Sequence, residues 1–153
     1  MARVPALVFE VDGQRYGLDV TQISELLPYV HLRRLPQVPE YVTGVFRYRD
    51  TMVPVIDMSH LISGKPAAAL LSTRIILVPY TGPAGTSRFL GLLAERASQI
   101  LEIDTAELKT SGVAVPDAPY LGSLSANGGS IIQYVKVEQL LPDDLRERLF
   151  VEE

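Results

Sequence analysis

The chain has 153 residues, 47% of them apolar, which is enough to fill one compact domain or two small subdomains that share a core. It contains no cysteine, which excludes disulfides, thiolate metal sites and cysteine nucleophiles, and its apolar runs are too short to span a bilayer. The net charge of −4 divides into +1 for residues 1–80 and −5 for residues 81–153. An acidic second half argues against a nucleic-acid-binding protein, which needs a sustained basic face. The N-terminus carries no secretion signal, so the expected location is the cytoplasm.

The first expected elements are strands at 6–11 and 14–18, because Asp12-Gly13 between two apolar runs is a strong hairpin signal. Asp19 and Gln22 have the spacing of a capping box, with Asp in place of the usual Ser or Thr. Residues 20–27 fit helical spacing and strand alternation equally well. We predict one helical turn that gives way to a strand near Ile23, then a short strand at 32–35.

The segment 43–58 has the composition of two β-rich stretches folded at Asp50-Thr51, with Arg49 beside the bend on the face opposite the Tyr48 ring. Gly44 marks a bulge or a point where another backbone approaches closely. Pro54 indicates an edge position or a bulge, so part of this hairpin is expected to be accessible.

The remaining elements follow from turn residues and apolar alternation. A brief helical turn at 60–62 is stopped by Gly64, and a C-terminal helix at 142–150 begins with Pro142 at its first position. Between them we predict a loop at 65–72 and three strands at 73–80, 89–97 and 100–103. An irregular stretch at 104–119, with a turn at 105–108, and a hairpin of strands at 120–125 and 130–137 are expected to follow.

A faint internal repeat relates the two halves. Gly44 and Gly122 are each followed by a strand, a turn and a second strand, although the second copy needs one extra residue to align. Two similar halves would suit two small barrels packed together.

The sequence offers little catalytic chemistry. His31 and His60 are the only histidines, and neither has a second ligand at metal-binding spacing, so no metal or cofactor is expected. No nucleotide-binding or hydrolase motif occurs. Asp57, among aliphatic residues, is either a perturbed general base or, as we favour, a structural residue bound by backbone amides or an arginine.

The basic side chains around the hairpin allow two interpretations. Arg33, Arg34, Arg47 and Arg49 form a local basic cluster, with only Glu40 between them in the sequence. Such clusters are usually solvated surface. The functional alternative is a docking patch for an acidic partner, in which Arg49 makes a bidentate contact with a carboxylate or carbonyl.

These residues resemble the CheW family of chemotaxis adaptors. The resemblance rests mainly on Gly44-Val45, Arg49 and the run from Val53 to Met58, and is continued by 7–18, 23–26, 35–36, 91–93, 98–101 and 120–122. It implies a single mainly β domain over 1–153, made of two intertwined five-stranded SH3-like barrels. The first barrel would span 14–80, the second 81–141 with the N-terminal strand, and a helix would follow at 142–150.

The resemblance also implies a non-enzymatic role. Such adaptors bridge the cytoplasmic tips of chemoreceptors to the regulatory domain of a CheA-type histidine kinase, without inserting into the membrane. The positions of Ile23, Glu25, Gly44 and Arg49 match family positions tied to those contacts, and Arg47 lies beside them. A strand starting at Ile23 would place Ile23 and Glu25 on one face.

The bend departs from the family pattern. Related adaptors usually have Asn-Leu-Arg-Gly where this chain has Arg47-Tyr48-Arg49-Asp50. Residues 46–49 and 71–74 look more like adaptors of the Wsp surface-sensing type, whose kinase controls a diguanylate cyclase. The leading hypothesis is therefore an adaptor in a receptor–kinase array. The alternatives are a small barrel that binds nucleic acid or a small ligand and, ranked lowest, a small hydrolase or transferase.

Overall fold

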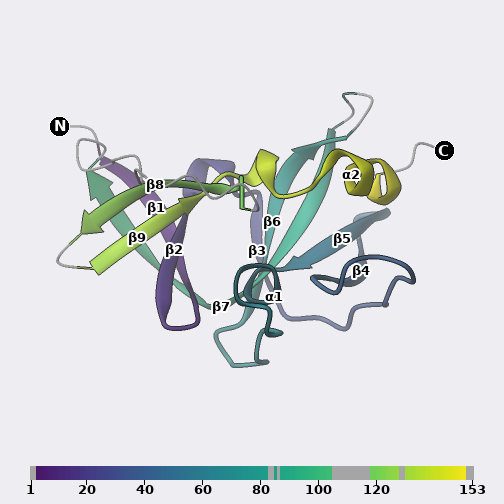
Figure 1. The fold of residues 1–153 in the computed structure, drawn as a ribbon, viewed down its shortest axis with the longest axis horizontal. Helices are drawn as coiled ribbons and strands as arrows, with labels where there is room; N and C mark the ends of the chain where they lie inside the picture. The colour runs from purple at the N-terminus through teal and green to yellow at the C-terminus, as the bar shows by residue number, and fades with distance from the viewer. Residues whose placement is uncertain (1–2, 83–84, 86, 105–117, 128–129, 151–153) are drawn as a thin grey trace.

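The computed structural model describes residues 3–82, 85, 87–104, 118–127 and 130–150. The fold is mainly β, as predicted, and its strands form two small barrels that share one long strand, β7 (Figure 1). The first barrel contains β3 (Glu25–Pro28), β4 (Val42–Tyr48), β5 (Thr51–Asp57), β6 (Arg74–Thr81) and the first part of β7 (Ser87–Asp104). The second contains the rest of β7, β1 (Arg3–Val11), β2 (Gln14–Asp19), β8 (Leu121–Asn127) and β9 (Ser130–Val135). The helical elements are η1 (Val20–Gln22), α1 (Met58–Ser63), η3 (Val137–Gln139) and α2 (Asp143–Leu149).

Strand β7 passes from one barrel into the other. It pairs with β6 as far as Ala94 and with β1 from Glu95 onward. Arg96 has a positive φ of 53° at the register shift near the start of the β1 ladder. The sequence predicted two strands here, at 89–97 and 100–103. They are one, because the ladder continues between them, with Gln99 opposite Val8. The pairings also put β2 in the second barrel, so the barrel boundaries differ from those expected near residues 14 and 81.

The core lies inside the barrels and between them. The largest apolar cluster contains residues of both barrels, including Phe9 and Leu18 from the second and Ile76 and Leu92 from the first. Smaller clusters fill each barrel, around Val8 in one and around Leu93 in the other. Strand β1 therefore buries both faces, with Ala6 and Val8 in one cluster and Leu7, Phe9 and Val11 in another, which explains its continuous apolar sequence.

The repeat seen in the sequence has a structural counterpart. The β4–β5 hairpin has a register shift between Val42 and Gly44, and the β8–β9 hairpin has one between Leu121 and Leu124. Strand β5 then runs parallel to β7, and β9 runs parallel to β2. Each hairpin is followed by a short helical element, α1 or η3.

Some local predictions were confirmed and others were wrong. The hairpin at Asp12-Gly13 forms, both residues having positive φ, and Gly64 ends α1. The predicted helical turn forms as η1 and gives way to a strand, as expected, although β3 begins at Glu25 and not at Ile23 itself, because the Ile23 amide still bonds to Val20. The region 32–35 forms no strand, only one bridge between Arg33 and Val45. Pro142 is the residue before α2, since its ψ of 153° is extended. Predictions for 105–117 and for the turn at 128–129 lie outside the described residues.

Candidate functional site

The turn of the β4–β5 hairpin lies at Arg49-Asp50, one residue earlier than predicted. Tyr48 and Thr51 close the ladder, and Arg49 and Asp50 between them have φ of 46° and 65°. Positive φ at both central residues gives a two-residue turn whose twist matches the twist of the two strands that it joins. Left-handed backbone is costly for residues other than glycine, and local contacts support it here. The Thr51 hydroxyl donates to the Tyr48 carbonyl at 2.6 Å, and Arg47 pairs with Asp50 at 2.8 Å.

The Arg49 guanidinium lies over the Tyr48 ring, 5.1 Å from its centroid. The prediction that Arg49 faces away from that ring was wrong. It assumed strand alternation, whereas the left-handed conformation at Arg49 takes its side chain out of the strand pattern. The arrangement is a cation–π contact on an exposed turn.

Tyr48 connects the turn to the neighbouring strands, and the sequence did not single it out. Its ring makes edge contacts with Phe46 on the same strand and with Phe89 on β7, at centroid separations of 6.5 and 5.7 Å. Its hydroxyl donates to the Glu25 carboxylate. That hydrogen bond is the main cause that raises the pKa of Tyr48 above its ordinary value. The signal in the sequence was the alternation of Phe46 and Tyr48, which places both rings on one strand face.

Of the other expected partner-binding residues, the structure brings Glu25 to the hairpin but not Ile23. Glu25 starts β3 opposite Leu77, is exposed and reaches Tyr48. Ile23 lies before β3 and packs, partly buried, against the largest core cluster. Arg47 is exposed and held by Asp50.

Gly44 is buried, and its place is set by a neighbouring backbone. The amides and carbonyls of Val45 and Arg33 bond to each other at 2.8 and 2.9 Å, which brings the Arg33 carbonyl against Gly44. A Cβ built on Gly44 would lie 2.6 Å from that oxygen. Gly44 is thus both the close-approach point and the bulge that its residue type indicated.

Pro54 sits opposite Val45 in the β4–β5 ladder. Since the amide and carbonyl of Val45 point outward to Arg33, this pair is not hydrogen-bonded, and the Pro54 nitrogen faces away from β4. The ladder between β5 and β7 covers only Val55 to Asp57, so Pro54 removes no bond from it. The part of the hairpin between Pro54 and the turn extends beyond the ladder with β7, and Met52 there is 58% exposed.

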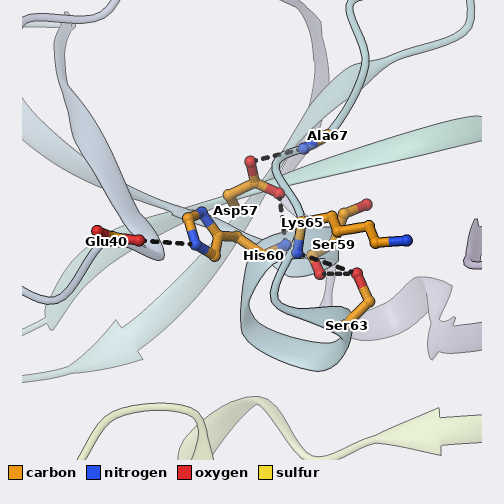
Figure 2. A network of polar contacts seen from close by, with 7 residues as sticks. All are labelled: Glu40, Asp57, Ser59, His60, Ser63, Lys65 and Ala67. Carbon is orange, nitrogen blue, oxygen red and sulfur yellow. Dashed lines mark hydrogen bonds and ion pairs between the residues drawn. The ribbon is translucent and has the colours of Figure 1, made fainter.

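Asp57 is buried and joins three segments (Figure 2). One carboxylate oxygen accepts from the His60 amide at 3.1 Å and caps α1, and the other accepts from the Ala67 amide at 2.9 Å. The Asp57 amide donates to the Tyr41 carbonyl. These bonds to backbone amides satisfy the buried carboxylate in a structural way, without an arginine.

The neighbouring Ser59 and His60 do not form a catalytic pair. The Ser59 hydroxyl donates to Glu95 at 3.1 Å. The His60 ring instead lies 3.3 Å from Glu40 (Figure 2). Within the described part of the chain, no group of three His, Asp or Glu side chains is placed to hold a metal ion. Its helices are all too short or too polar to cross a membrane.

Comparisons with known proteins agree with this architecture. The family model described as "CheW-like domain" matches residues 5–145. The chain is 24% identical over 140 residues to the chemotaxis protein CheW of Klebsiella aerogenes, covering 90% of this chain and 81% of that protein. It is also 24% identical over 143 residues to CheW of Rhizobium meliloti, covering 92% and 89%.

Among solved structures, the scaffolding protein TtCheW of Thermoanaerobacter tengcongensis has a TM-score of 0.80 at 22% identity, over 93% of this chain and 90% of that one. That likeness extends to the whole two-barrel fold. With the family model matching nearly the entire sequence, the chain belongs to the CheW-like domain family.

Proposed function

We propose that this chain is a non-enzymatic adaptor that couples the cytoplasmic signalling tip of a chemoreceptor to the regulatory domain of a CheA-type histidine kinase. It would work in the cytoplasm, beside membrane receptors. The relatives at the sequence level are named chemotaxis proteins, and the structural relative is named a scaffolding protein.

The observation that carries the proposal is the presentation of Arg49. The β4–β5 hairpin projects beyond the ladder with β7, and its turn holds Arg49 on the Tyr48 ring. On the other face of the hairpin, exposed Met52 lies opposite Arg47. Arginine and methionine are among the residue types that are enriched at protein–protein interfaces, and this hairpin exposes both.

The test is binding of the purified chain to a receptor signalling tip and to a kinase regulatory domain, measured by isothermal titration calorimetry. Absence of binding to both partners would refute the proposal. We predict that Arg49→Glu weakens one of these contacts by about tenfold or more, because charge reversal replaces a charge-assisted contact with repulsion. Arg49 is exposed and makes a cation–π contact worth about 0.5–1 kcal/mol, so the melting temperature should change little.

Arg3→Glu is the matched control, since Arg3 is an exposed arginine at the start of β1, in the other barrel. It makes the same change in net charge and should leave both affinities within twofold. A large loss of stability in Arg49→Glu would instead mean that Arg49 is a structural residue.

We also propose that the partner belongs to a surface-sensing system of the Wsp type. Arg47 and Asp50, which depart from the family bend, pair with each other at the turn and change the charge beside Arg49. Titrations against receptor tips from a surface-sensing and a flagellar system, in parallel, discriminate the two. Preference for the flagellar tip would refute this branch while leaving the adaptor role intact.

A further inference from the structure

The Tyr48 hydroxyl lies between two opposite charges. It donates its hydrogen to the Glu25 carboxylate, and the Arg49 guanidinium sits over the same ring, 5.1 Å from the centroid. The hydrogen bond to Glu25 is the largest influence on the pKa of Tyr48 and raises it, while Arg49 acts in the opposite direction. Both charged side chains are therefore within reach of one hydroxyl.

The three residues come from different parts of the chain. Glu25 begins β3, whereas Tyr48 and Arg49 end β4 and enter the turn. The Tyr48 ring is fixed by Phe46 and Phe89, so the hydroxyl does not depend on Glu25 for its position. Arg47, the other cation of the turn, is on the opposite strand face and is already paired with Asp50.

This geometry determines whether the Glu25 carboxylate binds the Arg49 guanidinium or the Tyr48 hydroxyl. An exposed carboxylate next to an exposed guanidinium would ordinarily form an ion pair with it. Here the carboxylate accepts the phenol hydrogen instead, and the exposed guanidinium remains over the face of the ring.

We propose that Tyr48 is a positioning residue that holds the Glu25 carboxylate away from Arg49 and so keeps the guanidinium available to a carboxylate of a partner protein. The partner contact in this inference rests on the proposed adaptor function. The separation of Glu25 from Arg49 is a property of the free chain.

The experiment compares the wild type, Tyr48→Phe, Glu25→Gln and the double variant. Tyr48→Phe keeps the ring, and with it the packing on Phe46 and Phe89, but removes the hydroxyl. The first measurement is the NMR signal of the Arg49 Nε–H group in the free protein, assigned by its loss in Arg49→Lys. In Tyr48→Phe, we expect a downfield shift and slower exchange as Glu25 pairs with Arg49. Both changes should be absent from the double variant.

The second measurement is affinity for the kinase regulatory domain and the receptor tip. Tyr48→Phe should bind about two- to fivefold more weakly, because an exposed ion pair between Glu25 and Arg49 must then be broken before Arg49 can contact the partner. The double variant should bind as Glu25→Gln alone does, because the neutral amide at position 25 does not hold the arginine, with or without the Tyr48 hydroxyl. A merely structural role of the hydroxyl would make Tyr48→Phe weaken binding as much in the Glu25→Gln background as in the wild type.

An Arg49 signal in Tyr48→Phe that does not depend on residue 25 would overturn the inference, whatever the affinities. So would a loss of affinity from Tyr48→Phe that is as large in the Glu25→Gln background as in the wild type. If the wild type binds neither partner, the adaptor function fails, and the NMR comparison alone still decides whether Tyr48 separates the two charges.

Discussion

The resemblance places Gly44 among partner contacts, whereas the structure gives it a buried position under the Arg33 backbone. We predict that Gly44→Ala lowers the free energy of unfolding and affects partner binding only through this loss. A Cβ at this position would lie 2.6 Å from the Arg33 carbonyl oxygen and 3.0 Å from the Leu32 Cβ, and real Cβ atoms do not approach other atoms closer than 3.0 Å. The Arg33 backbone must therefore move away.

The cost follows from what that movement breaks. The bridge between Arg33 and Val45 consists of two hydrogen bonds, at 2.8 and 2.9 Å, and a shift of the carbonyl lengthens both. Each contributes about 0.5–1.5 kcal/mol, so their loss amounts to about 1–3 kcal/mol. Gly44 also has a φ of 154°, which side chains rarely adopt, and this adds about 1 kcal/mol. The expected destabilisation is about 2–4 kcal/mol in total.

Urea unfolding followed by circular dichroism measures this difference. Gly13→Ala is the matched control, since Gly13 also has a positive φ, of 77°, in a hairpin, but no atom beyond its two chain neighbours lies within 4 Å of its Cβ position. It should lose only the roughly 1–2 kcal/mol of left-handed strain. The reasoning would be refuted if Gly44→Ala unfolded at the wild-type urea concentration and still lost affinity, because Gly44 would then be a contact surface.

Two further predictions concern the buried polar groups. Asp57→Ala should lower the free energy of unfolding in urea by about 2–4 kcal/mol, since it removes the cap of α1 and the bond to Ala67. Asp57→Asn should lower it by about half as much, because one oxygen remains. Equal stability of the wild type and Asp57→Ala would contradict the structural role of Asp57. Stability should also fall as the pH rises above about 10. Burial raises the pKa of five tyrosines above the ordinary value of 10.0, namely Tyr16, Tyr41, Tyr80, Tyr120 and Tyr134, and the bond to Glu25 raises the pKa of Tyr48. As the pH rises, the unfolded chain therefore loses these protons before the folded chain does. The stabilisation disappears as the pH passes the pKa values of the folded state. Unfolding free energies that stay level from about pH 9 to about pH 11.5 would contradict this.

The parts of the fold that depend on local residue preferences were predictable. Asp12-Gly13 specifies its own turn, and Gly64 specifies the end of α1, because glycine and aspartate adopt the left-handed backbone there. The continuity of β7 was not predictable in the same way. Ser98 and Gln99 carry no strand preference, and their place is set by the ladder with β1, which lies at the start of the chain. A local bond, by contrast, keeps Ile23 out of the strand expected to begin near it, since the Ile23 amide donates to the Val20 carbonyl.

The β4–β5 hairpin was also predictable only in part. Its two strands and its arginine followed from composition and from the family resemblance, but the residues that surround Arg49 did not. A turn with Arg and Asp at its two central positions gives no glycine signal, so the reading of strand alternation put the bend one residue too far and the side chain on the wrong face. Once the turn is placed, Tyr48 is beneath the guanidinium, and the Tyr48 hydroxyl meets Glu25, which comes from a strand that β4 does not pair with. Because Glu25 and Arg49 converge only in three dimensions, the charge that the turn presents to a partner depends on the fold, and a comparison of residues 47–50 alone is insufficient to assign the partner.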